Sequence, residues 1–347
     1  MEYVKEKQGC KTLIDHGTLI ISLDFELYWG VQDVMSLEQY QDNLLGVRQA
    51  VPEMLKLFQE HEIHATWATV GKLFFETKSQ LLSSQPLLKP NYENSTFSGY
   101  RLINKIGESE KEDPFHYAHS LIEQILLVPH QEIGTHTFSH YYCLEAGQTA
   151  GEFAADVKKA IEIGNEKKIN IKSIAFPRNQ VNQDYLTICR ENGLTSYRGN
   201  EVFPIYNASP FIESQYTYKR ILRLVDSYVN ITGHHIYSLD TLDTEPIVNL
   251  PSSRFLRPYN PKLKMLEKLR LKRINNSITK AAKQNKMYHL WWHPHNFGVN
   301  LEENLQFLSK ILTHFSRMKR NYGMKSYNMA EASAIIIDTF RKTEIIQ

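Results

Sequence analysis

The chain has 347 residues, of which 42% are hydrophobic and 22% are charged, and its formal net charge is +2. This composition can build a large core, and the length suits an α/β barrel with insertions. The nearly balanced charge gives no indication of a nucleic-acid partner. The sequence has no run of about 18 apolar residues, so we expect no transmembrane segment.

The cysteines and the amino-terminal stretch predict the compartment. Cys10, Cys143 and Cys189 are too few for a disulfide framework and suit a reducing environment. The first 17 residues lack the apolar core of a signal peptide. We therefore expect a cytoplasmic protein, and the sequence leaves its oligomeric state open.

Short apolar runs alternate with amphipathic stretches along the chain. In chain order we expect a strand over 18–24, a helix over 36–58, a strand over 63–70, a helix over 114–127, a strand over 132–135, a helix over 149–168, a strand over 171–176, a helix over 182–193, strands over 194–197 and 287–292, and helices over 300–320 and 330–341. Pro52 should break or kink the first helix. The alternation favours parallel β/α units in a barrel or a doubly wound sheet.

Three segments depart from this alternation. Residues 79–113 are rich in Ser, Pro, Asn and Lys, and we interpret them as an insertion between the second and third strand units. Residues 204–261 carry six prolines and should be irregular. Residues 262–286 form a basic helical segment. No low-complexity linker separates these segments, so we expect residues 1–347 to form a single domain.

Polar side chains follow four of the predicted strands directly. The four groups are Asp24 with Glu26, His136 with His140, Arg178, and His293 with His295. In β/α barrels, reacting groups come from the carboxyl-terminal ends of several strands. We therefore expect these four groups to converge.

Each group alone has an ordinary explanation. His136 and His140 are four residues apart, which suits one metal ion but also arises by chance. Asp24 and Glu26 should face the same side of a strand end, whether in a site or in solvent. Arg178 could equally form a surface ion pair. Together, two histidines and one carboxylate would make a three-ligand metal site, with a second carboxylate free to act as a base.

Five motifs in the same order resemble the polysaccharide deacetylases of carbohydrate esterase family 4, the NodB-homology domain. They are SLDFE at 22–26, ATWATVGKLF at 65–74, HTFSH at 136–140, FPRNQ at 176–180 and WWHPHNF at 291–297. The resemblance implies a distorted (β/α)7-type barrel, a divalent metal ion, commonly Zn2+, and hydrolysis of an N-acetyl amide on a sugar by a metal-activated water.

The resemblance also implies a role for each matching residue. Glu26, His136 and His140 would be metal ligands, Asp24 the general base, His293 the general acid, and Arg178 a catalytic residue that tunes Asp24. A backbone N–H near Tyr141 could hold the oxyanion. Two alternatives stay open: Asp24 could replace Glu26 as the third ligand, and His295 could replace His293 as the acid.

The expected substrate is an acylated amino sugar or a sugar-containing precursor. A deformylase or another amidase acting on a small non-peptide substrate is one alternative. A catalytically silent relative that binds a glycan or a protein partner is another. Arg254, Arg257 and the basic run 262–273 could meet the phosphate of a nucleotide- or lipid-linked sugar, or could form a solvated basic face. Trp67 and Trp291 could stack on a sugar or pack in the core.

Overall fold

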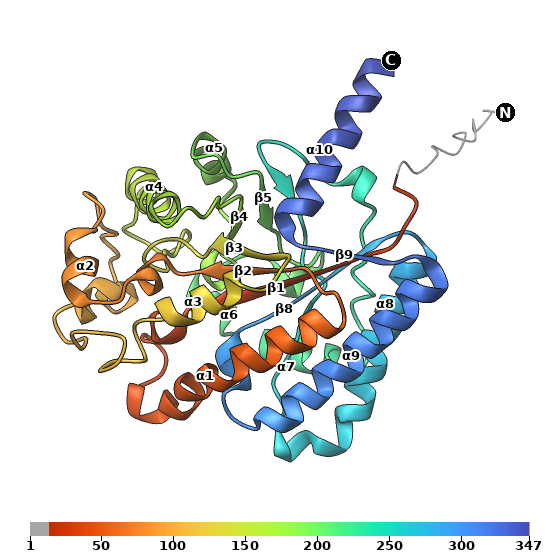
Figure 1. Cartoon of the computed structure of the whole chain (residues 1–347), viewed down its shortest axis with the longest axis horizontal. Helices are drawn as coiled ribbons and strands as arrows, with labels where there is room; N and C mark the ends of the chain where they lie inside the picture. The colour runs from red at the N-terminus through yellow and green to blue at the C-terminus, as the bar shows by residue number, and fades with distance from the viewer. Residues whose placement is uncertain (1–13, 347) are drawn as a thin grey trace.

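A computed structural model describes residues 14–346 and contains one twisted parallel sheet surrounded by helices (Figure 1). Within these residues the strands are β1 (Thr18–Phe25), β2 (Ala65–Thr69), β3 (Gln131–Thr135), β4 (Ser173–Ala175), β5 (Ser196–Arg198), β6 (Val248–Asn249), β7 (Arg254–Phe255), β8 (Met287–Trp292) and β9 (Lys325–Tyr327). The helices are α1 (Leu37–Glu60), α2 (Lys78–Ser83), α3 (His119–Leu126), α4 (Ala150–Glu166), α5 (Leu186–Glu191), α6 (Phe211–Ser214), α7 (Thr217–Asp226), α8 (Glu267–Lys283), α9 (Leu301–Tyr322) and α10 (Met329–Ile346).

The sheet curls into a barrel with seven strand positions. Its order is β6-β5-β4-β3-β2-β1-β8-β7, and β9 adds to the start of β1. β6 pairs with β5 while β7 pairs with β8, and only residues 250–253 separate β6 from β7. The segment 248–255 therefore bridges the two ends of the sheet. This topology confirms the predicted distorted (β/α)7-type barrel.

The two-residue period of β1 divides its side chains between two faces. Leu19, Leu23 and Phe25 belong to the large hydrophobic cluster under the helices, whereas Ser22 and Asp24 alternate with them and face the barrel interior. All eight residues of β1 are buried, because helices cover the outer face and side chains fill the interior. The first strand therefore holds Ser22 and Asp24 on a rigid element.

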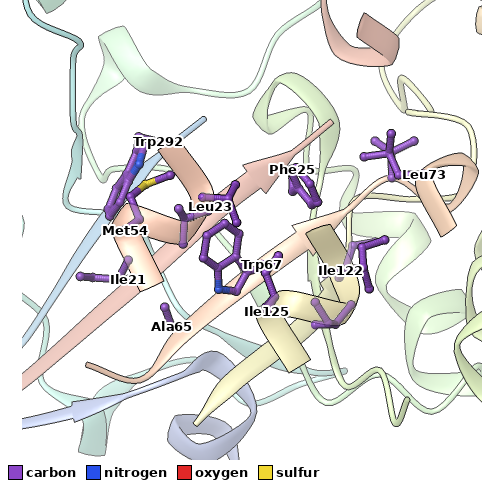
Figure 2. Packing of buried hydrophobic residues seen from close by; sticks show 14 of the residues in the cluster. Ile21, Leu23, Phe25, Met54, Ala65, Trp67, Leu73, Ile122, Ile125 and Trp292 are labelled. Atoms are coloured by element: carbon purple, nitrogen blue, oxygen red, sulfur yellow. The ribbon is translucent and has the colours of Figure 1, made fainter. Parts of the chain in front are cut away.

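The outer face of the sheet packs around Trp67 of β2. Figure 2 shows this side chain among residues of β1, α1 and α3, including Leu23 and Ile125. Trp67 is fully buried, and its indole N–H donates to the side chain of Gln131 at 3.1 Å. Replacement by alanine should cost about 3–5 kcal/mol of stability through lost packing. Trp67 is therefore a core residue, as one of the two sequence interpretations held.

The structure corrects the expected course of some helices. α1 runs from Leu37 to Glu60 without a break, although it contains Pro52. Buried side chains before and after the proline hold both halves of the helix on the sheet. α3 begins at His119, five residues later than predicted, and α5 covers only part of the predicted helix 182–193. These ends differ because short helices depend on tertiary packing more than on sequence pattern.

The segments expected to be irregular contain further structure. Residues 79–113 lie between β2 and α3, with the end of α2 and two 3-10 turns. Residues 204–261 contain α6, β6 and β7, which are too short for a periodic signal. They also contain α7, a ten-residue amphipathic helix, so the expectation of an irregular segment was wrong there. α8 lies within the basic helical segment 262–286, as predicted. In residues 14–346, no helix is long and apolar enough to cross a membrane.

One lysine is buried without an ion-pair partner. Lys72 is 0% exposed, and its ammonium lies 4.4 Å from the ring centre of Trp29 and 4.0 Å from that of Tyr100. Its Nζ has no hydrogen-bond partner among the described residues. Burial lowers the pKa of Lys72 from 10.5 to about 7. Cation–π contacts therefore replace the solvation of this side chain only in part.

Cys143 and Cys189 are free and buried, while Cys10 lies outside the described residues, as does most of the stretch used for the signal-peptide prediction.

Candidate metal and catalytic site

Glu26 follows β1 on the same face as Asp24, at the carboxyl-terminal end of the barrel. Its side chain is buried, and Gly30 leaves room for it. A Cβ atom on residue 30 would lie only 2.0 Å from Cδ of Glu26. Gly30 is therefore required for the position that this carboxylate takes.

His136 and His140 lie on the turn that follows β3. The backbone N–H groups of Phe138 and Ser139 both donate to the buried carboxylate of Asp156 on α4, at 2.7 and 3.3 Å. His140 has a φ of 62°, in the left-handed region, which returns its ring toward His136. The packing of α4 therefore fixes the turn and brings the two imidazoles together.

Both histidines converge on Glu26. Nε2 of His136 lies 3.2 Å from Oε2 of Glu26, and Nε2 of His140 lies 3.0 Å from the same oxygen. All three residues are buried, and their ligand atoms lie within 4.8 Å of one another. Burial alone would raise the pKa of Glu26, but His293, His136 and His140 hold it well below the usual range. The carboxylate is therefore ionised.

These three groups fit a divalent metal ion. Nδ1 of His136 donates to the carbonyl of Ala175 at 2.7 Å, so its Nε2 carries a lone pair directed at Glu26. A lone pair facing a carboxylate oxygen requires a cation or a proton between them. Two imidazole nitrogens and one carboxylate are a frequent ligand set of catalytic zinc, with one position left for water or substrate. Nδ1 of His140 is buried without a hydrogen-bond partner among the described residues.

Asp24 is held by an arginine that the sequence reasoning missed. Nη1 and Nη2 of Arg198, at the end of β5, donate to Oδ1 and Oδ2 of Asp24 at 2.6 and 2.7 Å. Both side chains are buried. Burial alone would raise the pKa of Asp24, but Arg198 and then His136 outweigh it and lower the pKa below 3.8. Asp24 therefore stays ionised beside the three candidate ligands.

Arg198 is itself fixed from three sides. It donates to Ser22 Oγ at 3.1 Å and to Asn179 Oδ1 at 2.9 Å, and it lies 4.2 Å from the ring centre of Trp291. His289 Nδ1 donates to a backbone carbonyl at 3.0 Å, so its Nε2 accepts from Ser22 at 2.8 Å. Burial lowers the pKa of His289 to about 3, so this ring is neutral. The pair of hydrogen bonds from Arg198 to Asp24, the clamp on Asp24, is thus preorganised.

His293 lies between the two carboxylates. Its Nε2 is 3.7 Å from Asp24 Oδ2 and 3.6 Å from Glu26 Oε1, and its side chain is 23% exposed. His295 stacks on His293 with ring centres 5.0 Å apart and is only 4% exposed. Burial, followed by the charge of His293, lowers the pKa of His295 to about 3. His293 therefore offers the accessible imidazole.

Arg178 does not meet Asp24, contrary to the prediction. Its guanidinium pairs with Asp33 and lies 4.4 Å from the ring centre of Tyr142 and 3.9 Å from that of Phe211. Arg178 has a φ of 54°, which turns the chain after β4 and directs the side chain away from Asp24. The positive charge beside Asp24 comes from the next strand, through Arg198.

The structure also bears on the expected roles of the Tyr141 backbone N–H and of Trp291. The backbone N–H of Tyr141 already donates to Thr137 Oγ1 at 2.7 Å, so it is not free for an oxyanion. Trp291 lines a cavity beside the site rather than lying wholly within the core.

A second group that could hold a metal ion lies at the opposite end of the strands. His64 and His130 come just before β2 and β3, and they stack 3.9 Å apart beside Glu331 of α10. His64 Nδ1 pairs with this carboxylate at 2.7 Å. Since reacting groups in β/α barrels lie at the carboxyl ends of the strands, this group is not part of the candidate active site.

The comparisons with known proteins bear on the family and on the fold. Residues 40–197 match the polysaccharide deacetylase family model, which includes the histidine pair but begins after Asp24 and Glu26. No curated protein matches the sequence.

Several solved structures share the architecture. A protein from Mycobacterium smegmatis assigned to the polysaccharide deacetylases has a TM-score of 0.58 and 12% identity, with 93% of this chain and 91% of that chain covered. A 4-α-glucanotransferase from Thermococcus litoralis has a TM-score of 0.52 and 11% identity, covering 92% of this chain and 40% of that one. A GH57-type branching enzyme from Pyrococcus horikoshii has a TM-score of 0.51 and 12% identity, covering 90% and 69%. Such identities show a shared fold.

The five ordered motifs, the match over residues 40–197 and the curled parallel sheet agree with one another. Residues 40–197 are therefore similar in sequence to the polysaccharide deacetylase family, and the described residues are similar in fold to a protein assigned to it.

Proposed function

We propose that the protein is a metal-dependent hydrolase that removes the N-acetyl group from an amino sugar or a sugar-containing precursor. The observation that carries this proposal is the convergence of Glu26, His136 and His140 on one point, with a separately held carboxylate, Asp24, beside them. The M. smegmatis relative and the family match support the choice of an acylated sugar.

Glu26 Oε2, His136 Nε2 and His140 Nε2 would hold the ion, most simply Zn2+. When bound, a divalent ion supplies Lewis-acid polarisation of the amide carbonyl and lowers the pKa of a water molecule. Burial of the three ligands keeps bulk water away and so strengthens electrostatic interactions within the site.

Asp24 would accept the proton of the attacking water. A general base must be ionised and held within reach of its proton. Arg198 provides both conditions, because it lowers the pKa of Asp24 and fixes both carboxylate oxygens. Arg198 acts through Asp24 and is a positioning residue.

His293 would donate a proton to the leaving amine. Its Nε2 lies within 4 Å of both carboxylates, and the side chain is partly exposed toward the space where a substrate would enter. His295 is buried behind His293 and supports its ring by stacking.

Release of acetate from N-acetylated sugars by the zinc-loaded protein tests this proposal. We expect Asp24→Asn to bind zinc and lose turnover, whereas His136→Ala should lose zinc and turnover together. Asp184→Asn, at an exposed position on a 3-10 turn, is the matched control and should behave as wild type. If Asp24→Asn kept most of the activity, the assignment of the base would be wrong.

The two alternative functions give different results in the same assay. A deformylase would release formate from N-formyl substrates faster than acetate from N-acetyl ones. A silent relative would bind glycan without releasing either acid.

A further inference from the structure

A large basic cavity adjoins the candidate active site. Its volume is about 640 Å3, and residues between 200 and 227 form most of its wall together with Phe255 and Trp291. The cationic side chains that line it are Arg178, Lys219, Arg220, Arg223, Arg254 and Arg257. Glu201 is the one carboxylate among its lining residues. The cavity therefore carries a strong excess of positive charge, although the whole chain is almost neutral.

The cavity and the catalytic groups share walls. Trp291 lies beneath Arg198, and Asn179 accepts a hydrogen bond from that arginine. The ring of Phe255 lies 5.7 Å from that of His293. A substrate whose amide reaches His293 would therefore place its neighbouring groups in the cavity.

Most of these cations have no acidic partner. Arg254 pairs with Asp226, and Arg178 pairs with Asp33. Among the side chains of residues 14–341, no carboxylate forms an ion pair with the other four cationic side chains that line the cavity. One of these four, Arg257, donates a hydrogen bond from its Nε to Ser227 Oγ at 2.8 Å.

Two of the arginines keep part of their hydrogen-bonding capacity or charge without a partner. Arg254 is 4% exposed, and its Nη2 is buried without a hydrogen-bond partner in the part of the chain that is described. Burial, with further repulsion from Arg223 and Arg254, lowers the pKa of Arg257. Holding such charges close together costs free energy that an anionic ligand would recover.

We infer that this cavity binds the phosphate group of a phosphate-linked amino sugar, so that the phosphate lies among Arg223, Arg254 and Arg257 while the amide reaches the catalytic groups. This inference rests on the proposed function and deepens it by naming the substrate class. Guanidinium groups match phosphate oxygens in bidentate geometry and remain charged at any working pH. A neutral polysaccharide would leave Arg223 and Arg257 without an acidic partner. The volume also leaves room for a diphosphate or for the group attached beyond it.

Binding of inorganic pyrophosphate tests the anion site by itself. The His136→Ala variant is the background, because without a complete ligand set the probe cannot bind through a metal ion. At an ionic strength of about 0.15 M, where exposed charges are screened, we expect saturable binding in calorimetry. Arg223→Gln and Arg257→Gln should each weaken it at least tenfold, while Arg320→Gln, an exposed arginine of α9, should leave it unchanged. Equal weakening by all three substitutions, or no saturable binding, would overturn the inference.

A kinetic comparison separates this inference from the proposed function. Acetate release is measured with N-acetylglucosamine, its 1-phosphate, and its nucleoside-diphosphate and prenyl-phosphate derivatives. We expect kcat/KM to be at least tenfold higher for a phosphate-linked form, with most of the gain lost in Arg223→Gln. Whichever linked form is preferred identifies the source of the phosphate. Equal kcat/KM for free and phosphate-linked sugars would refute the phosphate site but leave the proposed hydrolase activity standing. Pyrophosphate binding without acetate release from any substrate would refute the hydrolase activity but not the anion site.

Discussion

Replacing Arg198 by methionine should disable the base without removing the metal ligands. The side chain keeps much of its length, but the buried Asp24 carboxylate loses two charge-assisted hydrogen bonds of 2.6 and 2.7 Å and its arginine counter-charge. Breaking a buried ion pair in this way costs about 3–5 kcal/mol of stability. Loss of an effective general base lowers kcat by about 10²–10⁴. We expect both effects in Arg198→Met.

Three measurements separate this role from general damage. Denaturant unfolding gives the stability loss, calorimetry gives zinc affinity, and acetate release gives kcat and KM. We expect near-normal zinc affinity and KM, with kcat reduced at least a hundredfold in protein that is still folded. Arg198→Lys keeps the charge but loses the two-pronged contact, so it should recover part of kcat.

Arg178→Met provides the matched comparison, because this arginine pairs with Asp33 rather than with Asp24. Its effect on kcat for a neutral sugar should be at least tenfold smaller than that of Arg198→Met. If Arg178→Met lowered kcat as much as Arg198→Met, or if Arg198→Met retained wild-type kcat, the assigned clamp on Asp24 would be wrong.

The remaining predictions concern the ligands, the acid and the core. Gly30→Ala should weaken zinc binding at least tenfold in calorimetry, since its Cβ would displace Glu26; unchanged affinity would contradict this packing argument. His293→Gln should lower kcat about 10²-fold or more for amides, whereas His295→Gln should cost less; the reverse order in acetate release would reassign the acid. Lys72→Met should raise the free energy of unfolding by a few kcal/mol, because it removes a buried charge. Between pH 7 and 10.5 the unfolded wild type holds a proton that folded Lys72 releases, so wild-type stability rises with pH in this window. The advantage of methionine should therefore be full below about pH 7 and shrink toward pH 10.5 in denaturant titrations; an advantage that grew with pH would contradict it.

The barrel and part of the site could be predicted because they depend on local pattern. The strand before Asp24 is a continuous apolar run, and the two-residue period alone places Asp24 and Glu26 on one side. The same rule, that reacting groups follow strands, led to His136 and His293. It could also have led to Arg198, which follows directly after the predicted strand 194–197.

The rest depends on contacts between distant segments. Nothing local distinguishes Arg198 from Arg178; the left-handed backbone of Arg178 and its pairing with Asp33 decide which arginine meets Asp24. β6 and β7 are two residues long each and exist only because neighbouring strands pair with them. Arg254 and Arg257 were noted for their charge, but only the fold places them in a cavity beside His293.

A zinc titration with simultaneous measurement of acetate release tests the central claim most directly. Metal-depleted protein is titrated with Zn2+ while an N-acetylated amino sugar, free or phosphate-linked, is present. Activity should rise linearly and saturate at one equivalent of zinc, and His140→Ala should abolish both uptake and activity. Stoichiometric uptake that survives His140→Ala, or acetate release that is independent of zinc, would contradict a metal centre formed by Glu26, His136 and His140.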